Sequence, residues 1–417
     1  MKRHAIWTAA CIVGGLLAGS APVRAGEEPA KTPATAPATR PAAKPITQNI
    51  QKAVGWLVNS QNKDGSWGQG EESSQMGGGA QLKSTPNVAD TCMALMAMVH
   101  AGQNPKEGDH SQNVINGINF VCAQIEDSDE KSLFCTSLRG TRTQSKLGTY
   151  IDTFLAAQML GEVKNVMHSE AATKRVADAL AKIVKKIETN QKEDGRWAAD
   201  GWAPALAQGQ AAKALNIAAM SGVTIDEKVR ERAEKFARAD YQSIGAAAKP
   251  SAGSAGVELY SRAGQLTVMN ASDAYNLELR KELETIVAAP TTKPEEKQAA
   301  QQRLASIKEN EKDLADATKV VIDRMKDARF VAGFGNNGGE EFLSHLNIGE
   351  ALYQRGGEDW TKWDQGMTAN INNIQNADGS WSGHHCITGR TFCTSAALMV
   401  LCIDRAPTAI GGKIKRQ

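Results

Sequence analysis

The stretch of sequence that decides the fold is residues 56–67, which read WLVNSQNKDGSW. Within it, Leu57, Gln61, Gly65 and Trp67 follow the pattern aliphatic-x3-Gln-x3-Gly-x-Trp. The pattern returns as IETNQKEDGRW at 187–197 and as INNIQNADGSW at 371–381. A pattern that recurs along a chain indicates supersecondary units that stack on one another. The repeated residues of the two later copies are Gln191, Gly195, Trp197, Gln375, Gly379 and Trp381.

The spacing of the glutamines gives the number of units. A degenerate copy at Gln124 lacks the Gly-x-Trp, and it stands almost midway between Gln61 and Gln191. The next step, from Gln191 to Gln375, is about three times as long as either of the first two. We therefore expect six helical hairpins, of which the fourth and fifth are degenerate.

Helical periodicity dominates from Ile46 onward, and strand signals are scarce. The first helices of the six hairpins are predicted at 46–61, 112–126, 171–191, 226–240, roughly 300–328 and 363–376. The second helices are predicted at 86–101, 147–161, 203–221, 256–271, 341–355 and 390–404. The second helices carry more Ala, Met and Leu and less charge. Since a helix that is apolar on most faces is buried, they are expected to form an inner ring.

Six such hairpins can close into an all-α toroid around a central cavity, with an open solenoid as the alternative. The repeated residues are interpreted as structural. Gly permits a tight turn after the outer helix, and Trp folds back as an apolar lid. The Gln side chain can bond backbone groups at a neighbouring helix end.

The unit Trp56-Leu57-x3-Gln61-x3-Gly65-Ser66-Trp67 resembles the repeat of the squalene–hopene cyclases and of protein prenyltransferase β subunits. The resemblance covers about residues 46–405 and implies a terpenoid-cyclase-like α/α toroid. The Asp-x-Asp-Asp acid motif of the alkene-protonating cyclases is absent, as is the Asp-Cys-Thr-Ala-Glu run of the oxidosqualene type. The thioester relatives need Gly-Cys-Gly-Glu-Gln, and the nearest string, at 338–342, has no Cys.

The N-terminus has the pattern of an export signal over residues 1–25, with Lys2-Arg3, a short apolar run and a cleavage site after Ala25. A retained anchor is the alternative. Residues 26–45 form a Pro/Ala/Thr-rich linker that is expected to be disordered, and 406–417 form a basic tail. A periplasmic or secreted location follows. The chain holds 48 Lys+Arg and 46 Asp+Glu, a charge of +2 that excludes a broad nucleic-acid-binding surface.

Candidate chemistry lies where the inner helices begin. Asp90 and Asp152 stand near these N-termini and could perform acid–base work, although capping is the alternative role. His345, on the fifth inner helix, is the third catalytic candidate. Gln210, Thr394 and Arg390 are predicted to line a ligand-binding rim.

A metal site is a second idea, because protein prenyltransferases hold zinc with Asp, Cys and His. His384, His385, Cys386 and Cys393 form a possible N/S cluster. No Cys-x2-Cys or His-x3-His spacing exists, so no cofactor is predicted and zinc stays an alternative.

Six cysteines remain after signal cleavage, and an even number permits disulfides in an exported chain. Cys135 follows Gln124 at the same spacing at which Cys386 follows Gln375, so the two could pair across one rim. Local pairs, Cys122–Cys135 and Cys386–Cys393, are the other possibility. Cys92 and Cys402 lie in apolar helices and are expected to be buried thiols.

Residues 273–328 depart from the repeat and predict a charged helical hairpin or a long outer helix. The first functional hypothesis is a non-cyclase toroid that binds an apolar or elongated ligand, or a protein partner. The second is an enzyme, either an isoprenoid cyclase or transferase or a polysaccharide lyase or hydrolase.

Overall fold

The computed structural model describes residues 43–73, 82–197, 200–244, 255–326 and 338–406. Every helix below belongs to one compact unit of the chain. The predicted signal peptide (1–25), the linker up to residue 42 and the tail from 407 lie outside the described residues. Among the residues that are described, no helix combines the length and the apolar character needed to cross a membrane.

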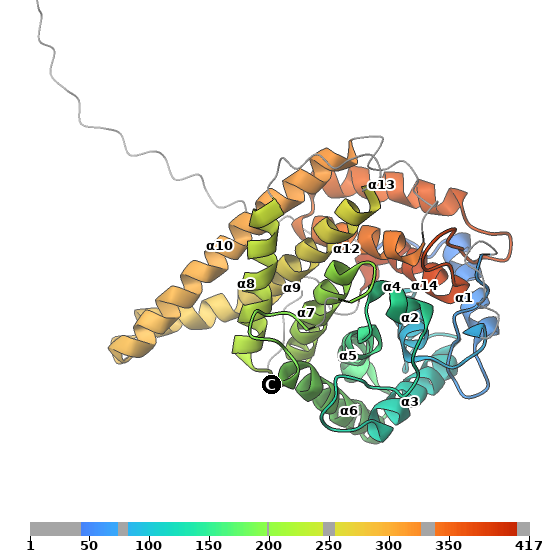
Figure 1. Cartoon of the computed structure of the whole chain (residues 1–417), viewed down its shortest axis with the longest axis horizontal. Helices are drawn as coiled ribbons and strands as arrows, with labels where there is room; N and C mark the ends of the chain where they lie inside the picture. Colours follow the sequence, from blue (N-terminus) through green and yellow to red (C-terminus); the bar gives the residue numbers. More distant parts are fainter. Residues whose placement is uncertain (1–42, 74–81, 198–199, 245–254, 327–337, 407–417) are drawn as a thin grey trace, which may run out of the picture. The chain divides into compact units, whose positions relative to one another are not determined.

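The helices alternate along the chain between an inner and an outer position (Figure 1). The inner helices are α2 (Val88–His100), α5 (Ile151–Val163), α7 (Pro204–Met220), α9 (Ala255–Ala288), α12 (Gly339–Arg355) and α14 (Arg390–Leu401). The outer helices are α1 (Gln48–Ser60), α3 (Ser111–Asp127), α6 (Glu170–Thr189), α8 (Glu227–Ile244), α10 (Pro294–Met325) and α13 (Gly357–Asn373).

The inner helices form a closed ring. Each packs against the inner helix before it and the one after it, and α14 packs against α2. The outer helices surround this ring, and each packs against the inner helix that precedes it around the ring (Figure 1). The predicted all-α toroid of six hairpins is therefore confirmed, and the open solenoid is wrong. One short helix, α4 (Arg142–Leu147), was not predicted; it precedes α5 and begins with a capping box at Thr141.

Burial explains why the two kinds of helix differ in composition. Every residue of α5 is buried, and so is every residue of α2. In the outer helix α6 only one face is buried, and Lys and Glu occupy many of the remaining positions. An inner helix touches neighbours on all sides, so nearly every position favours an apolar or small residue. This asymmetry is the one that the sequence predicts.

The repeated glutamine joins consecutive hairpins. Gln61 Nε2 donates to the carbonyl of Gly65 at 2.8 Å and to that of Asn113, in the first turn of α3, at 2.9 Å. The two N–H donors of one amide thus bond to the turn of one hairpin and to the outer helix of the next. The other two copies repeat the arrangement, with Gln191 bound to the carbonyl of Val229 in α8 and Gln375 bound to that of Asn49 in α1. The last of these contacts joins the sixth hairpin to the first and closes the ring.

The tryptophan and glycine of each copy complete a latch. Trp67 is fully buried, and its Nε1 donates to the carbonyl of Leu57 at 2.8 Å. Its backbone N–H donates to the hydroxyl of Thr91, on the inner helix, at 2.9 Å. Gly65 has a φ of +89°, and a Cβ there would lie 2.5 Å from the carbonyl oxygen of Asn116. A glycine is therefore required for both conformation and space. Trp197 and Trp381 bond in the same way to the carbonyls of Ile187 and Ile371.

The region predicted to depart from the repeat forms an arm. Helices α9 and α10 are much longer than their counterparts and run antiparallel beyond the ring (Figure 1). Residues 289–293 connect them, and a separate small core holds them together. That core consists of the buried side chains Leu283, Ala300 and Ile307 with partly buried neighbours. Over its described residues, 273–326, the predicted insertion is therefore the shared extension of one inner and one outer helix.

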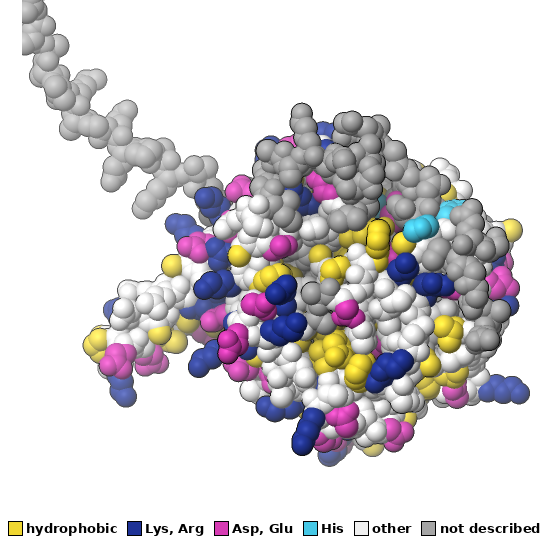
Figure 2. Space-filling model, viewed as in Figure 1, with side chains coloured by type: hydrophobic (Ala, Val, Ile, Leu, Met, Phe, Trp, Pro, Cys, Tyr) yellow, Lys and Arg dark blue, Asp and Glu magenta, His cyan; other side chains and the backbone are white. Residues whose placement is uncertain are grey.

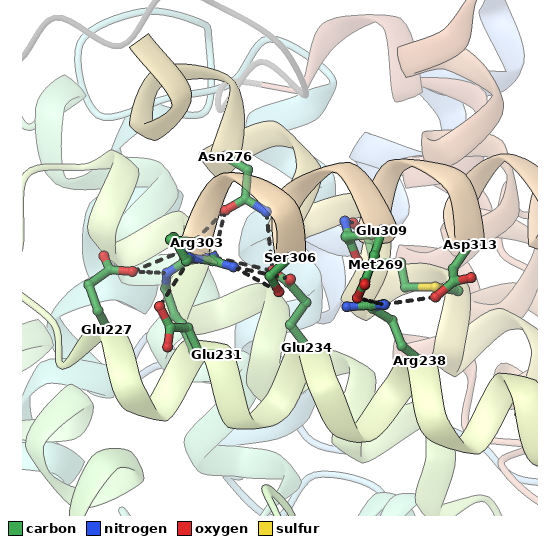
Figure 3. A network of polar contacts seen from close by, with 12 residues as sticks. Glu227, Glu231, Glu234, Arg238, Met269, Asn276, Arg303, Ser306, Glu309 and Asp313 are labelled. Carbon is green, nitrogen blue, oxygen red and sulfur yellow. Dashed lines mark hydrogen bonds and ion pairs between the residues drawn. The ribbon is translucent and has the colours of Figure 1, made fainter. Parts of the chain in front are cut away.

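A network of polar contacts fixes the base of this arm to α8 (Figure 3). Arg303 of α10 pairs with Glu231 at 3.0 Å and donates to the amide oxygen of Asn276 at 3.0 Å. Further along, Arg238 of α8 pairs with Asp313 at 2.8 Å and with Glu309 at 2.7 Å. Because these contacts come from three helices, they hold the arm at a defined angle to the ring.

Ring contacts begin inside the segment that was predicted as linker. The backbone N–H of Lys44 donates to Asp404 at 2.6 Å, and its ammonium pairs with Asp364 of α13. The guanidinium Nε of Arg405 donates to the carbonyl of Lys44 at 3.0 Å. The two ends of the ring are therefore joined by contacts between the residues that precede the first hairpin and those that close the sixth.

The six cysteines of the described part are free and buried. None of the pairs considered, Cys135–Cys386, Cys122–Cys135 or Cys386–Cys393, is formed, so the disulfide expectation is wrong for this structure. Burial raises the pKa of Cys135 to about 12, which keeps this thiol protonated and unreactive.

Candidate functional site

The two predicted carboxylates lie at the rim where the inner helices begin. Asp90 is in the first turn of α2, and Asp152 is in the first turn of α5. Asp152 accepts from the backbone N–H of Ala89 at 3.0 Å and from the amide of Gln144 at 2.8 Å. Asp152 therefore accepts from a backbone N–H in the first turn of α2 and joins two inner helices. The N-cap residue of α2 is Asn87, so Asp90 does not have that role.

A third carboxylate on this rim was missed by the sequence analysis. Glu340 is in the first turn of α12 and is completely buried. Its Oε2 accepts from the backbone N–H of Ile387 at 3.1 Å. Its position near the start of an inner helix matches those of Asp90 and Asp152, so alignment of the repeats could have indicated it.

Burial makes these carboxyls weaker acids than usual. It raises the pKa of Asp90 to about 7, and the nearby charge of Asp152 adds to the rise. Burial likewise raises the pKa of Glu340 to about 7 and raises the pKa of Asp152. Asp90 Oδ2 and Glu340 Oε1 have no hydrogen-bond partner in the described part of the chain. A carboxyl with a pKa near 7 can hold or release a proton at neutral pH.

Loops of the first and sixth hairpins cover this rim. The backbone N–H of Thr391 donates to the carbonyl of Gln69 at 3.1 Å. A Cβ on Gly389 would lie only 2.6 Å from that same carbonyl oxygen, so the two loops are in close contact. Arg142 and Glu72 form an ion pair at 2.9 Å beside them. The exposed fractions of Asp90, Asp152 and Glu340 are 1%, 2% and 0%, so these carboxyls lie beneath the cover.

The predicted ligand-binding residues are dispersed. Thr394 is buried, and its hydroxyl accepts from the backbone N–H of Trp381 at 2.9 Å, which makes it part of the latch. Gln210 is buried and donates to Gln158 inside the ring. Arg390 is at the surface, where it pairs with Asp378 at 2.7 Å. Arg390 and Thr394 are one turn apart on α14 and both contact the turn of the sixth latch, whereas Gln210 lies apart from them on α7.

The ring centre contains a charged cluster that the sequence analysis did not identify. His100 Nε2 lies 2.9 Å from Glu162 Oε2, and Lys213 donates to both oxygens of Glu350 at 2.7 and 2.6 Å. Gln158 donates to the other oxygen of Glu162 at 2.7 Å. All of these side chains are buried, and they come from α2, α5, α7 and α12. The charge of His100 and its hydrogen bond lower the pKa of Glu162 against the effect of burial.

Little space remains beside this cluster. His100, Glu162, Lys213 and Glu350 line a cavity of about 30 Å³. One buried water needs roughly 10–15 Å³ on this measure, so the cavity holds about two water molecules. Ligand pockets for small molecules are typically about 300–1,000 Å³. His345 is also buried on α12, and burial lowers its pKa to about 4, so its imidazole is uncharged at neutral pH.

The four candidate metal ligands, His384, His385, Cys386 and Cys393, do not form a metal-binding group in the described part of the chain. Within the described ranges, no group of three or more His, Cys, Asp and Glu side chains could hold a metal ion. His385 Nδ1 lies 2.8 Å from Cys386 Sγ, while Cys393 is buried and donates to the carbonyl of Ile387 at 3.4 Å. His384 is exposed.

The fold, the latch and the repeat agree with one comparison. Residues 38–136 match the family model described as the squalene-hopene cyclase C-terminal domain. Over these residues the chain is similar to a terpenoid-cyclase domain. The matched part of this cyclase-like domain spans the first latch, with Gln61, Gly65 and Trp67, and reaches the second hairpin. No curated protein and no solved structure was found to match the chain.

Proposed function

We propose that this cyclase-like domain is an exported binding or scaffold toroid that performs no cyclase chemistry. The observation that carries the proposal is the buried charged cluster between the inner helices. The described residues around it line a cavity of about 30 Å³, whereas an isoprenoid cyclase needs a large apolar cavity. The absence of an Asp-x-Asp-Asp run in the sequence supports the same reading.

Binding would then use the outside of the toroid, and the arm is the candidate element. It consists of the extended parts of the long helices α9 and α10. The ion pairs of Arg238 and Arg303 set the angle between the arm and the ring. Acidic and basic side chains are interspersed over the face shown in Figure 2, including the tip of the arm. Such a surface suits a protein partner better than a polyanion. Leu277, on α9 in the arm, is 42% exposed.

The first test is a ligand and activity panel. The purified mature protein is incubated with squalene and with isoprenoid diphosphates, and products are sought by gas chromatography with mass spectrometry. We expect no product and no rise in melting temperature, because a ligand that binds the native state would raise it. Turnover of any isoprenoid would refute the proposal.

The second test places a photo-crosslinking residue at Leu277 in cells that make the protein. A matched position, Lys362, is on the exposed face of the outer helix α13. We expect a discrete adduct of higher mass from position 277 and none from position 362. Adducts from both positions, or from neither, would contradict the arm as the binding element.

A second function has one observation in its favour, namely the pKa of about 7 for Asp90 and Glu340. These carboxyls could serve as general acid and base if the covering loops opened. A panel of polysaccharides, assayed for reducing ends and for unsaturated products, tests this alternative. Activity that is present in the wild-type protein and lost in D90N would establish it.

A further inference from the structure

A slot lined by described residues lies in the fourth hairpin. The latches of the first, third and sixth hairpins each seat a Trp between the outer helix and its inner partner. The chain between α8 and α9 has no Trp, and residues 245–254 carry no aromatic residue. In this hairpin, a cavity of about 230 Å³ lies between α8, α9 and the preceding inner helix α7.

The repeat register shows that this cavity is where a latch Trp would stand. Gln375 bonds to Asn49 of α1, and Gln191 bonds in the same way to Val229 of α8, so Asn49 and Val229 are equivalent. The latch carbonyl of α1 belongs to Leu57, eight residues after Asn49. Eight residues after Val229 stands Ala237, which lines the cavity.

The neighbours of the filled slot in the third hairpin agree with this register. There, Trp197 packs edge-on against Phe154 of α5, the preceding inner helix, with ring centroids 6.0 Å apart. In the fourth hairpin the preceding inner helix is α7, and its residues Pro204 and Ala205 line the cavity. The cavity therefore has the same three walls as a filled slot.

The lining combines apolar walls with polar side chains, and the guanidinium of Arg196 lies 5.5 Å from the ring centroid of Phe236. Phe236, Ala237 and Ala205 provide apolar walls. Asp240 is the acid of the lining, and Gln265 donates its amide hydrogen to one carboxylate oxygen. An ionised carboxylate accepts through both oxygens, at about four lone-pair positions, so Asp240 keeps capacity for a donor from a ligand.

We infer that this slot binds a small planar aromatic molecule of indole type that carries an N–H donor. Its ring takes the place of the missing latch Trp, and its N–H donates to Asp240. The inference goes beyond the proposed function, because the slot is formed whether the toroid is a scaffold or an enzyme. Edge-on and offset contacts with Phe236 favour an aromatic ring over an aliphatic group of equal size.

The test uses 5-fluoroindole and the full mature protein, with fluorine NMR as the readout. We expect saturable broadening and shift of the ligand signal. Ser261→Phe, on the α9 wall, fills the slot and should weaken binding at least tenfold. Ser243→Phe is the matched control, since Ser243 is exposed on α8 outside the lining, and it should leave the dissociation constant unchanged.

The anchor is tested with a ligand that keeps the shape and lacks the donor. 5-Fluorobenzothiophene should bind about tenfold more weakly than 5-fluoroindole to the wild-type protein, because a hydrogen bond to a charged acceptor is lost. In Asp240→Asn the preference between the two ligands should shrink to about twofold. Circular dichroism and melting temperature confirm that each variant is folded.

Two results would overturn the inference. One is the absence of any saturable response of 5-fluoroindole to the wild-type protein. The other is equal binding by Ser261→Phe and Ser243→Phe, which would show adsorption elsewhere on the surface. Equal binding of the two ligands to the wild-type protein would remove the role of Asp240.

Discussion

Replacement of Gly379 by Ala tests whether the sixth hairpin is locked to the first. Gly379 has a φ of +93°, and a Cβ there would lie 2.6 Å from the carbonyl oxygen of Lys52 in α1. The left-handed conformation costs an Ala about 1–2 kcal/mol. Forcing a methyl group against a backbone oxygen adds about 1–3 kcal/mol, as overpacking does in other cores. We expect the free energy of unfolding to fall by about 3 kcal/mol.

Gly102 provides the matched control. It follows α2 with a φ of +91°, and nothing lies within 4 Å of the position that a Cβ would take there. Gly102→Ala should therefore lose only the conformational part, about 1–2 kcal/mol. The difference between the two variants isolates the contact between α1 and the loop after α13. A third variant, Gly65→Ala, should lose as much as Gly379→Ala, because its Cβ would lie 2.5 Å from a carbonyl oxygen of α3.

The assay is urea denaturation followed by circular dichroism at 222 nm. Similar slopes for the three variants would show that the midpoints report stability rather than a change in the denatured state. Equal losses for Gly379→Ala and Gly102→Ala would refute the reasoning, since the ring would then not be closed at Lys52.

The buried pair of Lys213 and Glu350 gives a second prediction. Lys213→Met should destabilise the protein by about 3–5 kcal/mol, because it leaves Glu350 buried and unpaired. The double variant K213M/E350L should recover most of this loss in urea denaturation. A double variant as unstable as the single one would contradict this. The raised pKa of Asp90, about 7, predicts a pH dependence, because the folded state keeps a proton that the unfolded state loses near pH 4. Stability should therefore decline between about pH 4 and pH 7, and the decline should be shallower in D90N; an unchanged slope in D90N would exclude Asp90 as its source. Free cysteines predict that the mature protein yields six thiols in a thiol-reagent assay after denaturation without reductant, and fewer would show a disulfide.

The repeat was predictable because its residues act locally. Each contact of the latch residues Gln61, Gly65 and Trp67 is with backbone groups of the same hairpin or the next. One copy of the repeat therefore contains all the residues that form the latch. The composition of α2 and α5 likewise revealed their burial, since an inner helix has no polar face. Six hairpins allowed either a closed toroid or an open solenoid, and the contact between α14 and α2 decides for closure.

The central cluster could not be predicted in the same way. Lys213 and Glu350 are far apart in the chain and occupy no repeated position, so only the closed ring shows that they meet. His100 and Glu162 lie at or near the C-terminal ends of α2 and α5, and no sequence pattern indicates that they pair. Asp90 and Asp152 were found by repeat alignment. Alignment could not show that segments of the first and sixth hairpins, which are far apart in the sequence but adjacent in the ring, cover them.

The contacts of Lys44 with Asp404 and Arg405 place the start and the finish of the ring beside each other. A circle whose ends adjoin has no privileged starting hairpin. A short peptide could join residue 44 to residue 405, and new termini could be opened in any loop between hairpins, with every latch retained. Circular permutation would then measure which hairpin junctions the fold needs to be continuous in the chain and which need only meet in space.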